Sequence, residues 1–274
     1  FDKLIKNFEK YRNSNINLSD EDLKILRDYQ ITGIKWMNII SKCGFGGILA
    51  DEMGLGKSIQ TIKFISQNRG KTLIVVPTSL IYNWENEFNK FGQDLKYLII
   101  NGNQIERYEL LEKINDYDVL ITTYGLLRND IEKYLEYEFD NFIIDEAQNI
   151  KNAFSQTTEA VKKIKAKTKF ALTGTPIENS LAELWSIFDF LMPQYLFNYH
   201  YFQKQYENDI VKNNDEEKTK QLKKLVTPFI LRRKKKDVLK DLPDKIENNI
   251  IVELNDEQKK LYLMQLEKTK EELD

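Results

Sequence analysis

Two short polar stretches of this chain carry residues that could hold a polyphosphate and a divalent cation. In the first, Gly54–Ser58, two glycines precede a lysine and a hydroxyl, shortly after the apolar run Ile48–Ala50. Glycines let backbone N–H groups approach phosphate oxygens, and a helix beginning after them directs its positive dipole end at the same place. Lys57 would reach the terminal phosphates, and the hydroxyl of Ser58 would hold Mg²⁺. Strand, glycine loop and helix together predict a phosphate site.

The second stretch is the acidic pair Asp145 and Glu146, which follows the apolar run Phe142–Ile144. A carboxylate at the tip of a buried strand can hold Mg²⁺ through water, and the next carboxylate can activate an attacking water. Each stretch alone has a simpler interpretation. Asp51 stands where the general phosphate-loop pattern has its first glycine, and an acid at a strand end is often a turn residue. Their occurrence in one chain favours a nucleotide site.

Composition limits the other kinds of chemistry. The sequence has one cysteine and one histidine, which excludes an internal disulfide and makes a cysteine zinc site or a Ser–His triad a poor hypothesis. A formal net charge of −2 gives no global electrostatic case for nucleic-acid binding. No apolar run approaches a membrane span, so we expect no membrane partner and a cytoplasmic location, nucleoid-associated if bacterial and nuclear if eukaryotic.

Short apolar runs alternate with amphipathic stretches through the first two thirds of the chain. This pattern predicts an α/β fold with a mainly parallel sheet, helices on both faces, and a helical appendage. Ligands of such sheets sit at the carboxyl ends of the strands, where the notable polar sequences fall. We expect the following parts: an amino-terminal extension (1–20), an ATP-binding lobe (21–180), a helical protrusion that returns to the lobe (181–243), and the start of a truncated second lobe (244–274).

Several segments, in this order, resemble the first ATPase lobe of the Swi/Snf family of superfamily-two helicase-like DNA translocases. The resemblance covers the chain from about Leu23 onward, and the order of the segments makes it specific. It rests on the following segments: Leu26–Gln30, Gly46–Ile62, Val75–Leu80, Ile121–Gly125, Asp145–Asn152, Leu172–Asn179, Glu183–Leu191 and Pro228–Arg233.

The resemblance implies a RecA-like fold, with ATP and Mg²⁺ as cofactors. It implies these ATP contacts: Gln30 for adenine, and Asp51, Glu52, Met53, Gly54, Leu55, Gly56, Lys57 and Ser58 for the phosphates. Lys57, Asp145 and Glu146 would be catalytic, with Ser58 and Asp145 on the metal. The residues that would couple nucleotide state to nucleic acid are Gln148, Thr173, Gly174 and Thr175. The residues that would touch the DNA backbone are Pro77, Thr78, Ser79, Thr123, Tyr124, Arg232 and Arg233.

The implied partners are double-stranded DNA, a second ATPase lobe of the same polypeptide, and a DNA-bound protein on which the motor acts. Because the second lobe would bring the arginine fingers, we expect this fragment alone to be nearly inactive. Two alternatives stay open: a nucleotide-gated module that binds DNA or a partner without motor activity, and an RNA or DNA helicase of the same superfamily. For Thr78, Ser79 and Thr123, a turn or a helix cap is the simpler interpretation, and the basic run Arg232–Lys236 also fits a solvated helix face.

Overall fold

The computed structural model describes residues 17–174, 180–238 and 255–271. The chain divides into two compact units, the first ending at Val238 and the second running from Leu239 to the end. Of the second unit the structure describes Asn255 and the helix α15, Asp256–Glu271. Of the predicted site residues only Thr175 lies outside the described ranges, together with most of the predicted 1–20 extension and residues 239–254.

A seven-stranded sheet organises the first unit, with strand order β3-β4-β2-β5-β6-β1-β7. All of its paired strands run parallel. The predicted α/β class with a parallel sheet is confirmed. The strands are β1 Gly47–Leu49, β2 Thr72–Val76, β3 Tyr97–Ile99, β4 Val119–Thr123, β5 Phe139–Ile144, β6 Ala166–Leu172 and β7 Ile230–Leu231.

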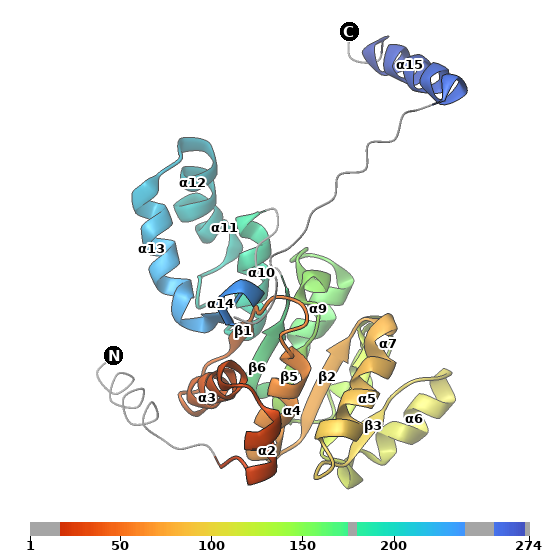
Figure 1. Ribbon diagram of the computed structural model, residues 1–274, viewed down its shortest axis with the longest axis vertical. Coiled ribbons are helices and arrows are strands. Elements are labelled where there is room, and N and C mark those ends of the chain that lie inside the picture. The colour runs from red at the N-terminus through yellow and green to blue at the C-terminus, as the bar shows by residue number, and fades with distance from the viewer. Residues whose placement is uncertain (1–16, 175–179, 239–254, 272–274) are drawn as a thin grey trace. The chain divides into compact units, whose positions relative to one another are not determined.

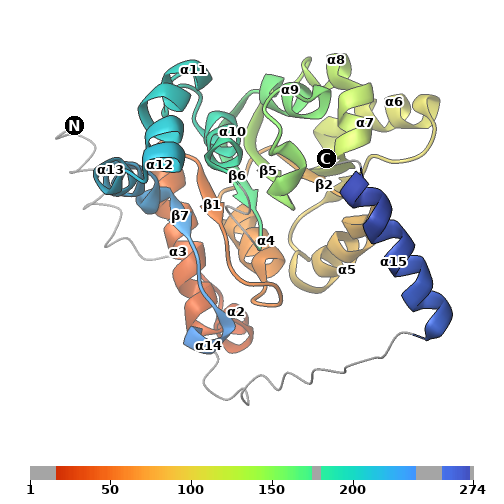
Figure 2. The same cartoon turned by 90° about the horizontal axis from the view of Figure 1, so that it is seen from above.

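Helices cover both faces of this sheet, as Figures 1 and 2 show: α3, α4 and α5 lie on one face, and α7, α9 and α10 on the other. The helices are α2 Asp20–Ile25, α3 Asp28–Lys42, α4 Lys57–Gln67, α5 Ile81–Phe91, α6 Gln104–Glu112, α7 Tyr124–Asn129, α8 Ile131–Tyr134, α9 Gln156–Lys163, α10 Leu181–Leu191, α11 Tyr199–Phe202, α12 Asn208–Asn213, α13 Glu216–Val226 and α14 Lys235–Val238. Short 3₁₀ turns lie at Thr78–Leu80, Ile114–Asp116, Ala147–Ile150 and Thr227–Phe229, and a π-helical turn at Gln203–Glu207.

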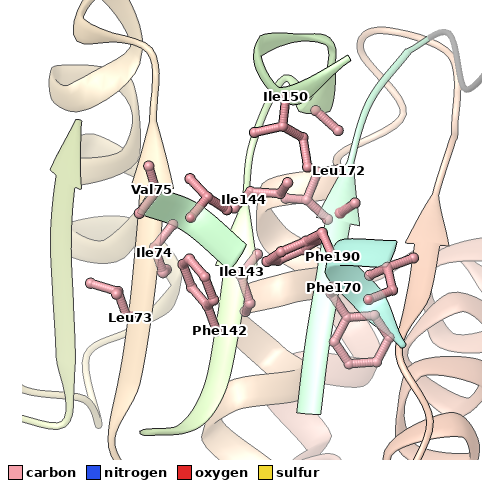
Figure 3. Packing of buried hydrophobic residues seen from close by; sticks show 14 of the residues in the cluster. Leu73, Ile74, Val75, Phe142, Ile143, Ile144, Ile150, Phe170, Leu172 and Phe190 are labelled. Carbon is pink, nitrogen blue, oxygen red and sulfur yellow. The ribbon is translucent and has the colours of Figure 1, made fainter. Parts of the chain in front are cut away.

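Strands in the middle of the sheet are largely buried because both faces are covered. Every residue of β2 and of β4 is buried, which explains why these segments read as continuous apolar runs rather than alternating ones. On one side Phe142 of β5 packs edge-on against Phe190 of α10, with ring centroids 5.2 Å apart (Figure 3). On the other side Phe170 of β6 meets Phe64 of α4 at 5.1 Å. The sheet is the middle layer of a three-layer core.

The return of the chain to the sheet was not predicted as a strand. After α13, residues Ile230 and Leu231 form β7, which pairs in parallel with Ile48 and Leu49 of β1. The backbone N–H of Ala50 then donates to the carbonyl oxygen of Leu231 at 2.7 Å. Two residues are too few for a periodic pattern to show. β7 therefore brings the residues after it beside the loop that follows β1.

Candidate functional site

The loop between β1 and α4 has the backbone that the sequence predicts for phosphate binding. Gly54 and Gly56 have φ values of 86° and 75°, in the left-handed region that residues with a Cβ rarely adopt. A Cβ at Gly56 would also lie 2.6 Å from Nε2 of Gln30. The helix α4 begins at Lys57 and is anchored by buried Ile62 and other apolar residues. Its first N–H groups are thus fixed at the end of the glycine loop, where an anion binds well.

Two of the predicted ligand residues stand at the start of this helix. The Nζ atom of Lys57 donates to the backbone oxygen of Asp51 at 2.9 Å, so the ammonium lies over the loop itself. Ser58 is half-buried one residue later. Lys57 can exchange its carbonyl partner for the more strongly accepting oxygens of a bound phosphate.

The side chain of Asp51 has a structural partner that sequence reasoning missed. It is fully buried and accepts from Nε of Arg233 at 2.8 Å, while a second guanidinium nitrogen contacts its other oxygen. Gln60 of α4 donates to the same carboxylate at 3.1 Å. The backbone pairs as well, since the N–H of Glu52 donates to the oxygen of Arg233 at 3.0 Å. Asp51 therefore ties the phosphate loop to the segment after β7.

This pairing bears on the role predicted for Arg233. Its guanidinium also donates to Gln60 Oε1 at 2.7 Å and lies over the ring of Tyr29, 5.3 Å from the ring centre. Arg233 is thus committed inside the lobe, whereas its neighbour Arg232 is exposed. Arg233 is far from Asp51 in the sequence, so no local pattern could show their contact. The only hints in the sequence were the acid in the position of the first glycine and the basic run Arg232–Lys236.

Gln30 lies against the phosphate loop, at the rim of the predicted ATP site. Its Nε2 donates to the oxygen of Leu55 at 3.2 Å, and its Oε1 accepts from the N–H of Arg27 at 3.0 Å. The hydroxyl of Tyr29 donates to the same Leu55 oxygen at 3.2 Å. The adenine role of Gln30 stays a prediction, and the structure shows that the residue also fixes the start of α3.

Asp145 is held firmly at the carboxyl end of β5. Its carboxylate accepts from Nε1 of Trp84 at 2.8 Å and from the N–H of Glu146 at 2.9 Å. The hydroxyl of Tyr124 donates to its backbone oxygen at 2.6 Å. Burial raises the pKa of Asp145, and the hydrogen bond from Trp84 opposes that rise. Trp84 and Tyr124 therefore orient the predicted metal ligand, which is a role the sequence did not reveal for either residue.

A chain of polar contacts runs from Glu146 to the end of β6. Glu146 adopts a left-handed backbone with φ of 50°, and its Oε2 accepts from Nε2 of Gln148 at 2.8 Å. The hydroxyl of Thr173 donates to Oε1 of Gln148 at 3.4 Å. The N–H of Thr173 donates to the oxygen of Leu49, the last residue of β1, at 3.2 Å. Gln148 and Thr173, both predicted to couple, thus link the acid to the strand before the phosphate loop.

The predicted DNA-contacting residues fall into two groups. Thr78 and Ser79 are exposed on the 3₁₀ turn after β2, and Pro77 precedes them half-buried. Thr123 and Tyr124 are buried, because Thr123 caps α7 by accepting from the N–H of Leu126 and Tyr124 holds Asp145. The cap interpretation thus describes Thr123. Among the predicted residues, Thr78, Ser79 and exposed Arg232 keep accessible side chains.

The predicted metal ligands supply few protein donors for Mg²⁺. Among the described residues no group of three or more His, Cys, Asp or Glu side chains could hold a metal by itself. Mg²⁺ bound with a nucleotide does not need such a cage, because it keeps several waters and takes one or two protein ligands plus phosphate oxygens. Ser58 and Asp145 fit that requirement, and Lys57 lies near enough to Asp145 to lower its pKa.

No described helix is long and apolar enough to cross a membrane.

The fold and the site together define a nucleotide-binding α/β protein with a RecA-like sheet. Residues 29–273 match the model of the SNF2-related domain, so the chain belongs to the SNF2 family. The structure is similar to the Sulfolobus solfataricus SWI2/SNF2 ATPase core in complex with dsDNA, with a TM-score of 0.74 and 42% identity, over 89% of this chain and 52% of that one.

Curated relatives extend the comparison. An uncharacterised ATP-dependent helicase of Mycoplasma pneumoniae is 43% identical over 277 residues, covering 98% of this chain and 26% of the relative. The ISWI chromatin-remodeling complex ATPase ISW2 of Saccharomyces cerevisiae is 36% identical over 252 residues, covering 89% and 22%. The chain therefore spans about a quarter of these relatives and about half of the solved core. The predicted family resemblance is confirmed.

Proposed function

We propose that this chain is the ATP-binding half of a DNA-dependent ATPase that translocates on double-stranded DNA and remodels protein–DNA complexes. The observation that carries the proposal is that the glycine loop and the acid pair Asp145–Glu146 both follow the carboxyl ends of parallel strands. There the positive charge of Lys57 lowers the pKa of Asp145. The dsDNA complex of a similar ATPase core and the family membership support the DNA part of the proposal.

Each residue of this edge has a role that its geometry supports. When bound, ATP with Mg²⁺ would supply the phosphoanhydride that is hydrolysed and a cation that offsets its negative charge. Lys57 and the first N–H groups of α4 would hold the phosphates, and Ser58 and Asp145 would hold the metal. Glu146 would orient the attacking water and take its proton, and Gln148 would position the Glu146 carboxylate through their 2.8 Å hydrogen bond.

In this proposal, a second lobe completes the ATPase site. Arginine fingers from such a lobe contribute roughly 10³–10⁵ in rate in phosphoryl-transfer enzymes. We expect the 274-residue chain alone to bind ATP and to hydrolyse it very slowly. Turnover by the isolated chain that matches a two-lobed motor and rises with DNA would contradict this division of labour.

The DNA contacts of the proposal are contacts to phosphates. Thr78 and Ser79 present small hydroxyls on an exposed turn at the carboxyl edge of the sheet, which suits positioning without sequence readout. Affinity for DNA should then fall log-linearly as salt rises, with a slope that is the same for unrelated sequences.

The central test replaces Glu146 by Gln in the full-length protein that contains this chain. We expect ATP binding to persist and DNA-stimulated hydrolysis to fall by about 10²–10⁴, the usual contribution of a positioned general base. Glu132→Gln, an exposed site on α8, removes the same charge and should leave the rate unchanged. If both variants hydrolyse ATP like the parent, Glu146 is not the base, and the alternative of a nucleotide-gated binding module gains support.

A second assay separates translocation from strand separation. We expect ATP-dependent displacement of a third strand from a triplex, without unwinding of a forked duplex. Release of the fork strands without triplex displacement would favour a helicase. Stronger stimulation by RNA than by duplex DNA would favour the RNA helicase alternative.

A further inference from the structure

A cavity lies at the amino ends of the strands β1 and β6, at the opposite end of these strands from the predicted ATP site. This lysine groove, with a volume of about 740 Å³, is lined by Gly44–Gly46 at the amino end of β1, by the segment from Lys162 to Lys169 at the amino end of β6, and by residues that follow α10. Lys169 is the fourth of the seven residues of β6, so at about 3.3 Å per residue it lies about 10 Å from the carboxyl end of that strand, and the other lining residues lie farther from that end. The groove is therefore separate from the site of Lys57 and Asp145.

Positive charge exceeds negative charge in this groove. Its lining contains the lysines 162, 163, 165, 167 and 169. Two of them are neutralised, since Lys162 pairs with Asp189 and Lys167 with Asp140, each at 2.7 Å. Within the described parts of the chain, no carboxylate lies within 4.0 Å of the other three ammonium groups, on Lys163, Lys165 and Lys169. Three positive charges thus remain without an ion-pair partner around one concavity.

Lys169 is the most unusual member of the set. It is only 8% exposed, and its ammonium lies over the ring of Phe190, 5.1 Å from the ring centre. Burial lowers the pKa of Lys169 to about 8, with Asp189 opposing the effect from beyond ion-pair distance. A buried ammonium without an ion pair is costly, and such a group is stabilised when an anion reaches it.

A glycine and two aromatic side chains line the groove beside the lysines. At Gly46 a Cβ would lie 2.5 Å from the backbone oxygen of Lys169, so only glycine fits there. Phe45 and Tyr195 line the groove and both pack edge-on against Phe229, with ring centres 5.2 Å away. Aromatic side chains beside a few polar or charged groups are typical of a small-molecule pocket, and the volume lies in the usual range of about 300–1,000 Å³.

We propose that the lysine groove binds a small phosphate compound at a second site, distinct from the ATP site. Its phosphate would be held by Lys163, Lys165 and Lys169, and the organic part, where there is one, would lie against Phe45 and Tyr195. We favour a compact ligand over a nucleic acid because Lys169, whose ammonium has no ion-pair partner among the described residues, is only 8% exposed. This inference goes beyond the proposed motor activity and does not depend on it.

The test uses the full-length protein containing this chain with Lys57→Ala, which removes the phosphate contact of the first site. Inorganic pyrophosphate and AMP are titrated separately by calorimetry, at low and high salt. We expect saturable binding of one molecule of pyrophosphate, and tighter binding of AMP if the aromatic wall contributes. Adding Lys169→Met should weaken pyrophosphate at least about tenfold, since charge-assisted hydrogen bonds are lost. Lys169→Arg should restore part of the affinity.

The matched control is Lys212→Met on α12, which removes an exposed lysine outside the groove. It should leave pyrophosphate binding unchanged. No saturable binding in the Lys57→Ala background, or equal losses in Lys169→Met and Lys212→Met, would overturn the proposal. Binding of a DNA oligonucleotide that depends on Lys169, without binding of pyrophosphate or AMP, would also overturn it in favour of a nucleic-acid surface.

Discussion

Replacing Arg233 by Met should destabilise the lobe and loosen the phosphate loop at the same time. The change keeps much of the aliphatic stem and removes the guanidinium that contacts Asp51, whose side chain is 0% exposed. Removing one partner of a buried ion pair leaves the other charge uncompensated and costs about 3–5 kcal/mol. Here Gln60 keeps its 3.1 Å hydrogen bond to Asp51, so we expect the lower part of that range.

We therefore expect Arg233→Met to lower the free energy of unfolding by about 3 kcal/mol. The thermal midpoint of a domain of this size would fall by on the order of 10 °C.

The assay is denaturant unfolding of the full-length protein, together with ATP affinity. Arg232→Met is the matched control: the neighbouring arginine is exposed, and its loss should change stability by less than about 0.5 kcal/mol. Adding Asp51→Asn to Arg233→Met removes the orphaned charge and should recover a large part of the loss. The reasoning is refuted if Arg233→Met unfolds within about 0.5 kcal/mol of the Arg232→Met control.

Three further predictions follow from single contacts. Trp84→Phe removes a hydrogen-bond donor that lowers the pKa of Asp145, so the acidic limb of the ATPase pH profile should move to higher pH. An unchanged acidic limb would show that the ionisation of Asp145 does not limit the rate. Lys169→Met should raise stability at pH 7 by an amount on the order of 3 kcal/mol or less. The pKa of Lys169 is about 10.5 in the unfolded chain and about 8 in the native structure, so the stability of the wild-type protein rises as the pH rises from about 8 to 10.5. Calorimetric melts should therefore show the stability advantage of Lys169→Met shrinking in that pH range. Gly33→Ala places a Cβ 1.9 Å from Oε1 of Gln60, so it should lower the free energy of unfolding by about 1–3 kcal/mol despite the better helix propensity of alanine. A melting temperature at or above that of the parent would contradict this prediction.

The sequence predicted features that depend on neighbouring residues. The sequence from Ser19 to Asp22, an acid three residues after a serine, predicts a helix start, and the structure has their reciprocal capping box, with hydrogen bonds of 3.1 and 3.3 Å. The apolar run Thr72–Val76 predicts a strand, and it forms β2 at those bounds. Local signals of this kind are set by the order of residues along a few turns or one strand, so they can be read without the fold. The same holds for the glycine loop, whose positive φ values follow from residue type.

Boundaries were less accurate where tertiary contacts intervene. The apolar pattern of Leu26–Ile40 predicts a helix, but in the structure that helix begins at Asp28, because Leu26 and Arg27 are extended between α2 and α3. The pattern of Leu126–Leu135 predicts one helix, but in the structure the helix begins at Tyr124 and is divided at Asp130 into α7 and α8. Asp130 is buried there and accepts a bidentate pair from Arg107 at 2.5 and 2.9 Å. That ion pair joins two elements, and no periodicity within either element indicates it.

By itself the sequence determined the class of sheet, the phosphate loop and the acid pair, because strand, loop and helix patterns are local and parallel strands bring their carboxyl ends together. Only the tertiary structure decided how these parts are held. It joins Asp51 to Arg233, sets Trp84 and Tyr124 on Asp145, and buries Lys169 against Phe190. The physical reason is that a buried charge requires a partner in space, and the partner can come from any part of the chain that the fold brings within reach.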